Sequence, residues 1–358
     1  MANFPVHPDD LTTTWLSEAL GARVESFESE PLGEGAGLLG VIHRVQPRYA
    51  KGAAGPASLV AKFATPTREN RVVAETFDMY GRELRFYARL ADRTPARAPR
   101  AWRAEFDEET SDFALLLEDL SGCRVGDQLA GADLADAERA ITQMVRLHAT
   151  WWGQADAEEV TWIPLHDNPV QVAGMSGGFE AGWPVFGTEL ADLIPAGQHE
   201  RYAKIGAATG ALVQRMCAGA VTVAHGDFRL DNLFFDVDGD PDGVAMFDWQ
   251  GITRSCGPQD LAYFLSQSLR SEVRREHGER LIRGYWEQLK DAGVRDYSID
   301  QCIEDYRVSV LYLFTFAVVI AGTLDASNER GVAMVRALAG RSAAAVHESG
   351  ALSLLDEL

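Results

Sequence analysis

The sequence predicts an α+β fold of two lobes, in which a strand-rich first third is followed by a mainly helical remainder. The chain has 358 residues, more than one compact core usually serves, so two lobes are expected. Alternating patterns typical of strands dominate from Arg23 to about Asp119, interrupted by one helical segment, whereas later patterns are mostly helical. We therefore predict an N-lobe over residues 1–118 and a C-lobe over residues 119–358.

The pattern of the first third predicts an antiparallel sheet of five strands and a helix. Residues 59–64 alternate with period two, and Lys62 lies inside this strand. After Pro66 the pattern becomes helical, and one helix face collects Glu83, Phe86, Tyr87 and Leu90. Residues 102–106 and 113–118 flank a polar turn and predict a hairpin.

The remainder predicts helices around one further hairpin. Asp133 is a suitable N-cap for a helix. Residues 154–220 mix prolines, glycines and aromatic residues, which favours loops and short helices over a pocket. Residues 221–224 form a short apolar strand, and residues 233–237 and 244–247 flank an Asp/Gly-rich turn, which predicts the hairpin.

One apolar stretch needs a decision between membrane and core. Residues 308–324 contain no charged side chain over 17 positions, just short of the roughly 18 that a membrane span needs. No aromatic belt flanks the stretch and no second span exists in the sequence. We therefore expect a central helix buried on all sides.

Composition and charge narrow the class of partner. The chain is 46% hydrophobic and 24% charged, which is typical of a globular protein. Its formal net charge of −20 repels phosphate backbones and anionic lipids, so nucleic acid and membranes are not expected as partners. The four cysteines show no metal-binding or redox spacing, and the N-terminus does not resemble a secretory signal, so we expect a cytoplasmic protein. The oligomeric state is not specified.

The strongest chemical signal is the segment His225–Asn232, which a hairpin joins to Asp248. Phosphoryl transfer needs a carboxylate that accepts the proton of an alcohol and oxygen ligands that hold Mg²⁺ against nucleotide phosphates. Asp227 and Asn232, five residues apart on one loop, suit the two sides of that task. Asp248 supplies a further carboxylate for the metal.

This motif order is similar to that of the aminoglycoside phosphotransferase and choline kinase group, and most resembles its ecdysteroid-kinase-like branch. The resemblance covers roughly residues 24–340 and implies a protein-kinase-like fold that uses ATP and Mg²⁺. It implies Asp227 as the catalytic base and Asn232 and Asp248 as metal ligands. Arg229 falls where the protein-kinase template has a loop cation, and it is expected to neutralise charge on the transferred phosphoryl group.

Three glycines near the N-terminus fit a phosphate-covering loop. Gly35, Gly37 and Gly40 form a Gly-x-Gly-x-x-Gly pattern, which alone suits a dinucleotide-binding turn, a kinase glycine loop or simple flexibility. The residues that follow, 41–45, are β-branched and extended rather than helical. We therefore expect these glycines to join two strands over nucleotide phosphates.

Further nucleotide contacts are expected from Lys62 and the segment Leu117, Glu118 and Asp119. A lysine inside an apolar strand needs an anion, which the phosphates provide. Its expected protein partner is Glu83, because Glu-x-x-Phe-Tyr resembles helix C of the family, with Glu75 as the second choice. The segment 117–119 resembles the hinge that receives adenine through backbone groups.

Two other residues are expected to act in support rather than in catalysis. His148 resembles a family histidine that supports the catalytic loop from a helix. Asp260 is expected to be an N-cap or a brace for the same loop.

The predicted function is ATP-dependent phosphorylation of a small-molecule alcohol. Nine residues separate Asp248 from Pro258, too few for the long activation loop of a protein kinase. The tryptophans near the catalytic loop favour an apolar or amphipathic acceptor, sterol-like or antibiotic-like, whereas the acidic charge favours an aminoglycoside or another cationic acceptor. These tryptophans are Trp151, Trp152, Trp162 and Trp183. A non-catalytic nucleotide-binding scaffold is the alternative of another class, and the complete set of catalytic motifs weighs against it.

Overall fold

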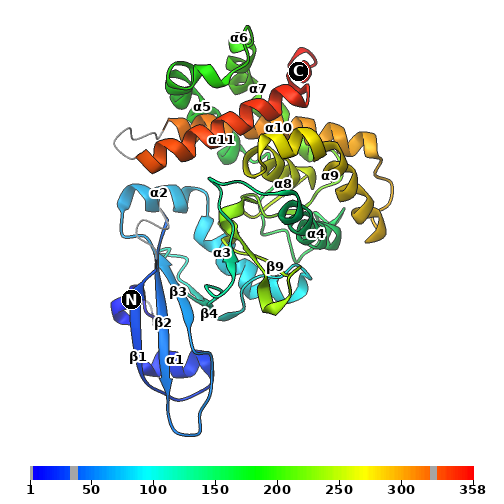
Figure 1. Cartoon of the computed structure of the whole chain (residues 1–358). Coiled ribbons are helices and arrows are strands. Elements are labelled where there is room, and N and C mark those ends of the chain that lie inside the picture. The colour runs from blue at the N-terminus through cyan, green and yellow to red at the C-terminus, as the bar shows by residue number, and fades with distance from the viewer. Residues whose placement is uncertain (1–2, 33–38, 323–328) are drawn as a thin grey trace. The chain divides into compact units, whose positions relative to one another are not determined.

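The computed structural model describes residues 3–32, 39–322 and 329–358 (Figure 1). The chain packs as two compact units. The first unit contains residues 1–93, 97–123 and 247–251, and the second contains residues 94–96, 124–246 and 252–358. The predicted α+β class is confirmed, because a five-stranded antiparallel sheet is followed by a mainly helical remainder.

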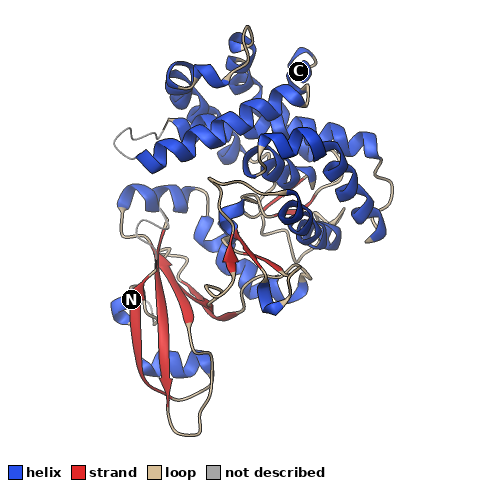
Figure 2. Cartoon of the chain, in the orientation of Figure 1, coloured by secondary structure: helices blue, strands red, loops and turns tan. Residues whose placement is uncertain are grey.

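The sheet of the first unit has the strand order β1-β2-β3-β5-β4, and its strands are drawn in red in Figure 2. Neighbouring strands are antiparallel throughout, and Lys62 in β3 pairs with Ile42 in β2 and Leu115 in β5. The strands are β1 (Val24–Pro31), β2 (Gly40–Tyr49), β3 (Leu59–Ala64), β4 (Ala101–Phe106) and β5 (Phe113–Glu118).

Helix α1 (Thr13–Leu20) closes the core on one face of this sheet. Its Trp15 and Leu16 are buried with Ala61 and Phe63 of β3 in a single hydrophobic cluster. Because side chains alternate across a strand, Lys62 points to the opposite face. Helices α2 (Arg68–Thr76) and α3 (Met79–Arg89) complete the unit.

The second unit consists of helices with two small sheets. One sheet pairs β7 with β10, and the other has the order β6-β8-β9. Asp133 caps α4 as predicted, since its side chain accepts a hydrogen bond from the Asp136 amide at 2.9 Å. The strands are β6 (Arg124–Val125), β7 (Thr222–Ala224), β8 (Leu233–Phe235), β9 (Val244–Met246) and β10 (Thr253–Ser255). The helices are α4 (Leu134–Trp151), α5 (Pro169–Glu189), α6 (His199–Ala203), α7 (Ile205–Ala218), α8 (Pro258–Tyr263), α9 (Ser271–Asp291), α10 (Ile299–Ala321) and α11 (Glu329–Glu348).

The expectation of loops and short helices over residues 154–220 agrees with residues 154–168 and with α6, but it was wrong for two long helices. Helix α5 spans 21 residues and α7 spans 14. Two glycines of α5, Gly178 and Gly182, are explained by close packing rather than by turns. A Cβ on Gly178 would lie 2.8 Å from Val319 Cγ2, and a Cβ on Gly182 would overlap the Val318 carbonyl oxygen of α10.

This packing makes Gly182→Ala destabilising. We expect a loss of about 1–3 kcal/mol in the free energy of unfolding, because the new methyl group forces α5 away from α10. The matched control is Gly177→Ala in the same helix, where an added Cβ meets nothing within 4 Å. That control should gain up to about 1 kcal/mol from helix propensity. Urea unfolding curves of both variants measure the difference, and equal stabilities would contradict the packing argument.

Helix α10 accounts for most of the long apolar stretch and is buried as predicted. Leu311, Tyr312, Leu313 and Phe314 have no exposed surface. Within the residues that the structure describes, no helix combines the length and apolarity required to cross a membrane.

Candidate active site

The first unit brings together Lys62, Glu83 and Asp248. The Lys62 ammonium (Nζ) lies 2.6 Å from Glu83 Oε2 on α3 and 3.1 Å from Asp248 Oδ1, two residues after β9. The Glu83 side chain is 1% exposed, that of Lys62 11% and that of Asp248 29%. The sequence-predicted lysine and glutamate are therefore an ion pair in the protein, and the predicted metal ligand Asp248 joins them.

Burial and charge act in opposite directions on this cluster. Burial alone would lower the pKa of Lys62, but the carboxylates of Asp248 and Glu83 outweigh it and raise that pKa above its ordinary value. Burial raises the pKa of Glu83, an effect that the ammonium of Lys62 opposes. Lys62 is consequently a fixed positive charge at neutral pH, which suits a group that binds phosphate.

The backbone of Asp248 is in an unusual conformation. Its φ of 62° lies in the left-handed region, which few residues other than glycine adopt. The next residue, Trp249, stacks on Phe86 of α3 with the ring centroids 3.6 Å apart. Outliers of this kind concentrate at functional sites, where the surrounding packing maintains them.

Of the three predicted glycines, Gly40 lies in the described part of the chain, and Gly35 and Gly37 lie outside it. A Cβ on Gly40 would lie 3.1 Å from the Phe63 carbonyl oxygen and 3.5 Å from Lys62 Cε. The start of β2 therefore approaches Lys62 closely, and a side chain here would crowd it.

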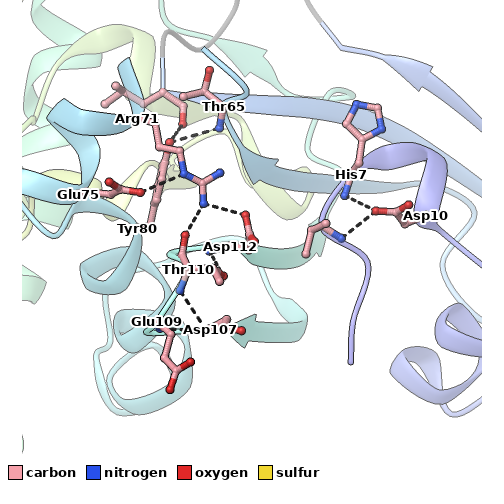
Figure 3. Close-up of polar contacts among 12 residues, drawn as sticks. His7, Asp10, Thr65, Arg71, Glu75, Tyr80, Asp107, Glu109, Thr110 and Asp112 are labelled. Atoms are coloured by element: carbon pink, nitrogen blue, oxygen red, sulfur yellow. Dashed lines mark hydrogen bonds and ion pairs between the residues drawn. The ribbon is translucent and has the colours of Figure 1, made fainter. Parts of the chain in front are cut away.

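The hydroxyl of Tyr80 fixes the start of β2 to the end of β3. It donates a hydrogen bond to the Leu39 carbonyl at 2.7 Å and accepts one from the Thr65 amide at 3.3 Å (Figure 3). Glu75, the second choice as partner of Lys62, instead accepts a hydrogen bond from Arg71 (Figure 3). The donor and acceptor atoms lie 3.0 Å apart. Arg71 also binds Asp112 at 2.8 Å, which ties α2 to the β4–β5 turn.

In the expected hinge, Leu117 to Asp119, the two acidic side chains accept hydrogen bonds from neighbouring protein side chains. Glu118 accepts two hydrogen bonds from Arg97, at 2.9 and 3.0 Å, and Asp119 accepts hydrogen bonds from Ser58 at 2.5 Å and Arg44 at 3.0 Å. Leu117 is buried in β5. Adenine recognition by backbone groups here stays a prediction.

The second unit holds the loop that follows β7, with Asp227, Arg229 and Asn232. The Asn232 Nδ2 donates to both the backbone carbonyl and the Oδ2 of Asp227, each at 2.9 Å. Arg229 Nε lies 3.4 Å from the same Oδ2. Since the amide nitrogen of Asn232 is bonded to Asp227, its Oδ1 is the atom suited to ligate a cation.

A buried carboxylate, Asp260, fixes the start of this loop. It accepts hydrogen bonds from the backbone amides of His225 at 2.6 Å and Gly226 at 2.9 Å, and lies 3.1 Å from His148 Nε2. Burial alone would raise the pKa of Asp260, but the hydrogen bonds from His148 and Gly226 hold it below its ordinary value. The supporting roles expected for His148 and Asp260 agree with this geometry, with Asp260 acting as a brace.

Sequence reasoning missed two residues at this loop, Gln128 and Tyr263. The Gln128 side chain accepts hydrogen bonds from the Leu230 amide at 3.0 Å and from Ser268 at 2.9 Å, and it is fully buried. Burial and then the charge of Asp227 raise the pKa of Tyr263 well above its ordinary value. A glutamine outside any motif gives no sequence signal, whereas Tyr263 lies three residues after Asp260 and was open to inference as its helical neighbour.

The predicted site residues thus form two sets, one in each unit. Asp227, Arg229 and Asn232 belong to the second unit, and Lys62, Glu83 and Asp248 belong to the first. In the described ranges, no group of three or more His, Cys, Asp and Glu side chains is placed to hold a metal ion.

Solved structures that are similar to this chain include phosphotransferases. An amicoumacin kinase in complex with AMP-PNP, Ca²⁺ and Ami superposes with a TM-score of 0.55 at 12% identity, covering 93% of each chain. APH(2")-IIIa in complex with GDP and kanamycin superposes with a TM-score of 0.54 at 12% sequence identity, and the match covers 96% of this chain and 97% of the APH(2")-IIIa chain. Plasmodium vivax ethanolamine kinase superposes with a TM-score of 0.51 at 11% sequence identity, and the match covers 93% of this chain and 82% of the ethanolamine kinase. No curated protein sequence matches the chain.

The fold of the chain is therefore the protein-kinase-like fold of these phosphotransferases. The sequence model of the ecdysteroid kinase-like family matches residues 34–295, and the chain belongs to this family. It is a small-molecule kinase, an enzyme that phosphorylates hydroxyl groups. The resemblance seen in the sequence motifs is confirmed.

Proposed function

We propose that the protein uses ATP and Mg²⁺ to phosphorylate a hydroxyl group of a small apolar or amphipathic alcohol. The observation that carries the proposal is the cluster of Lys62, Glu83 and Asp248, in which a buried ammonium is held by one carboxylate and lies beside a second. Such a cluster suits nucleotide phosphates and their cation. Nucleotide complexes of the structural neighbours, with GDP and with AMP-PNP, support the same assignment.

In this proposal the second unit acts on the acceptor. Asp227 accepts the proton of the acceptor hydroxyl, and Asn232 holds the Asp227 carboxylate in place through its Nδ2. Arg229, 3.4 Å from Asp227, neutralises charge that develops on the transferred phosphoryl group. Transfer therefore depends on groups that the loop fixes before the substrate binds.

The residues present fit Mg²⁺, a hard cation that prefers oxygen ligands. Asp248 offers a partly exposed carboxylate and Asn232 an amide oxygen. When bound, Mg²⁺ would neutralise negative charge on the nucleotide phosphates. Lys62 binds the phosphates by direct charge, and Glu83 keeps the ammonium oriented.

Replacing the carboxylate of Asp248 should weaken the effect of Mg²⁺ on nucleotide binding. In Asp248→Asn the Lys62 contact keeps an oxygen acceptor, but one anionic metal ligand is lost. We expect the affinity for ATP in Mg²⁺ to fall about tenfold or more, ~1.4 kcal/mol, with little change in its absence. Calorimetric titration of ATP with and without Mg²⁺ measures both. An unchanged Mg²⁺ effect in the variant would remove Asp248 from the metal site.

A row of aromatic side chains near Asp227 supports an apolar acceptor. Tyr263 lies 5.8 Å from Phe316 and Phe316 lies 5.8 Å from Tyr312, measured between ring centroids. Phe316 is half-buried, although its α10 neighbours from 308 to 318 are fully buried. Phe316 is thus the ring of this row that is partly exposed, and an exposed aromatic face suits the face of a ring system.

The four tryptophans expected near the acceptor have different neighbours from one another. Trp151 is buried and donates to Thr94, Trp152 packs on Tyr297, and Trp183 stacks on Phe179 and Phe186. Trp162 donates to the Glu159 carbonyl. The proposal of an apolar acceptor therefore rests on the rings of Tyr263 and Phe316 and not on the four tryptophans.

A cationic acceptor is the second candidate, favoured by the net charge of −20 and by a neighbour solved with kanamycin. Mass spectrometry of steroid alcohols and amino sugars incubated with protein, ATP and Mg²⁺ separates the two. A phosphate-sized mass gain on steroid alcohols alone is expected. A gain on amino sugars alone would establish the second candidate, and no gain on any alcohol would favour a non-catalytic scaffold.

A further inference from the structure

Three buried side chains form a row that ends at the loop of Asp227. The Tyr285 hydroxyl of α9 lies 2.8 Å from His148 Nδ1, and His148 Nε2 lies 3.1 Å from Asp260 Oδ2. All three residues are fully buried. Asp260 in turn accepts the amides of His225 and Gly226, the two residues that precede Asp227.

The hydrogen-bond donors and acceptors of this row can be assigned by starting from Asp260. The pKa of Asp260 is below its ordinary value and its oxygens already accept two amide hydrogens, so it is a carboxylate that accepts from His148 Nε2. A neutral imidazole that donates through Nε2 has an acceptor at Nδ1. In this tautomer the Tyr285 hydroxyl donates to Nδ1, so the two contacts of His148 are complementary.

The space around this contact is fitted closely. A Cβ on Gly257, one residue before α8, would overlap the Tyr285 hydroxyl and would lie 3.2 Å from His148 Nδ1 and 2.7 Å from a Trp152 ring carbon. The backbone at Gly257 therefore lies directly against the Tyr285–His148 contact, and any side chain there would displace the hydroxyl.

We propose that Tyr285 is a positioning residue of the kinase, which fixes the Nε2–H tautomer of His148 and through Asp260 the backbone that carries Asp227. The proposal rests on the function proposed above for Asp227. Tyr285 does not touch the reacting atoms. Its loss leaves Nδ1 of His148 without its hydroxyl partner, so that Asp260 alone holds the imidazole and the brace on the loop weakens.

The first test compares Tyr285→Phe with Tyr202→Phe. Tyr202 is also fully buried in the second unit and donates its hydroxyl to the Ala343 carbonyl at 2.7 Å, so both variants lose one buried hydrogen bond. We expect kcat to fall about tenfold in Tyr285→Phe alone, less than the 10²-fold that a 1 Å misplacement can cost. KM values should change little in either variant. Equal kcat values in the two variants would overturn the proposal.

A steric variant tests the same contact without removing the hydroxyl. Gly257→Ala should reproduce the fall in kcat, because its methyl group displaces the Tyr285 hydroxyl from His148. Gly284→Ala, next to Tyr285 on α9, adds a methyl group that meets nothing within 4 Å and should keep the wild-type kcat. A wild-type kcat in a folded Gly257→Ala variant would count against the inference.

The tautomer itself is measured by ¹⁵N NMR of histidine-labelled protein, with the His148 signals assigned through a His148→Gln variant. The wild type should show a protonated Nε2 and an unprotonated Nδ1, and Tyr285→Phe should shift the Nδ1 signal. A protonated Nδ1 in the wild type would overturn the inference. Because this experiment needs no turnover, it separates failure of the Tyr285 assignment from failure of the proposed kinase function.

Discussion

Asp227→Asn is expected to reduce phosphoryl transfer by about 10²–10⁴-fold while nucleotide binding in Mg²⁺ stays close to wild type. The amide keeps the size of the carboxylate but cannot accept a proton from the acceptor hydroxyl. The Asn232 Nδ2 still finds an oxygen at 2.9 Å, so the loop should keep its shape. Initial rates with a phosphorylated alcohol, together with ATP titration in Mg²⁺, measure the two quantities separately.

The control for this variant is Asp242→Asn, which makes the same chemical change in the exposed turn between β8 and β9. It should keep both transfer and nucleotide binding. Transfer at the wild-type rate in Asp227→Asn would defeat the assignment of the base. Parallel loss of transfer and of ATP binding would instead show that Asp227 contributes to the nucleotide site.

Local patterns predicted the elements that carry these residues. The strand at 59–64 and the strand at 113–118 have the bounds expected from the alternation of their side chains. Lys62 was recognisable because an ammonium inside an apolar strand needs an anionic partner. The pairing with Glu83 followed from the resemblance of Glu-x-x-Phe-Tyr to helix C of the family, and helical spacing alone did not identify the partner of Lys62.

Contacts between distant segments were not open to the same reasoning. Gly178 and Gly182 of α5 look like turn residues in the sequence, and only the proximity of Val319 and Val318 explains them as packing positions. The packing of residues 247–251 in the first unit depends on the stacking of Trp249 on Phe86, which no local pattern encodes. The link between Tyr285 and His148 joins residues 137 positions apart.

Lys62→Met is expected to lower the free energy of unfolding by about 3–5 kcal/mol and to abolish transfer. The variant leaves the Glu83 carboxylate buried, at 1% exposure, without its ammonium partner. Asp248, at 29% exposure, is partly solvated and contributes less to the loss. Thermal unfolding of wild type and variant measures the stability, and the transfer assay measures the activity.

The loss of stability in Lys62→Met should grow as the pH rises. Burial raises the pKa of Glu83, and Lys62 is the first charge that opposes this effect, so the folded-state pKa rises further without it. A carboxyl group whose pKa is raised in the folded state does not lower the free energy of unfolding below its unfolded-state pKa of about 4.3, because it is protonated in both states. As the pH rises through the folded-state pKa, the group must ionise while buried, and the free energy of unfolding falls. The variant should therefore lie closest to wild type near pH 5 and furthest from it near pH 8.

The double variant Lys62→Met/Glu83→Gln separates stability from function. Without the buried carboxylate, most of the lost stability should return, and the extra pH dependence between pH 5 and 8 should disappear. Transfer should stay abolished, because the amide restores packing but no positive charge faces the phosphates. A single variant as stable as wild type at pH 8 would show that Glu83 is not held ionised by Lys62, and recovery of transfer in the double variant would remove Lys62 from the phosphate site.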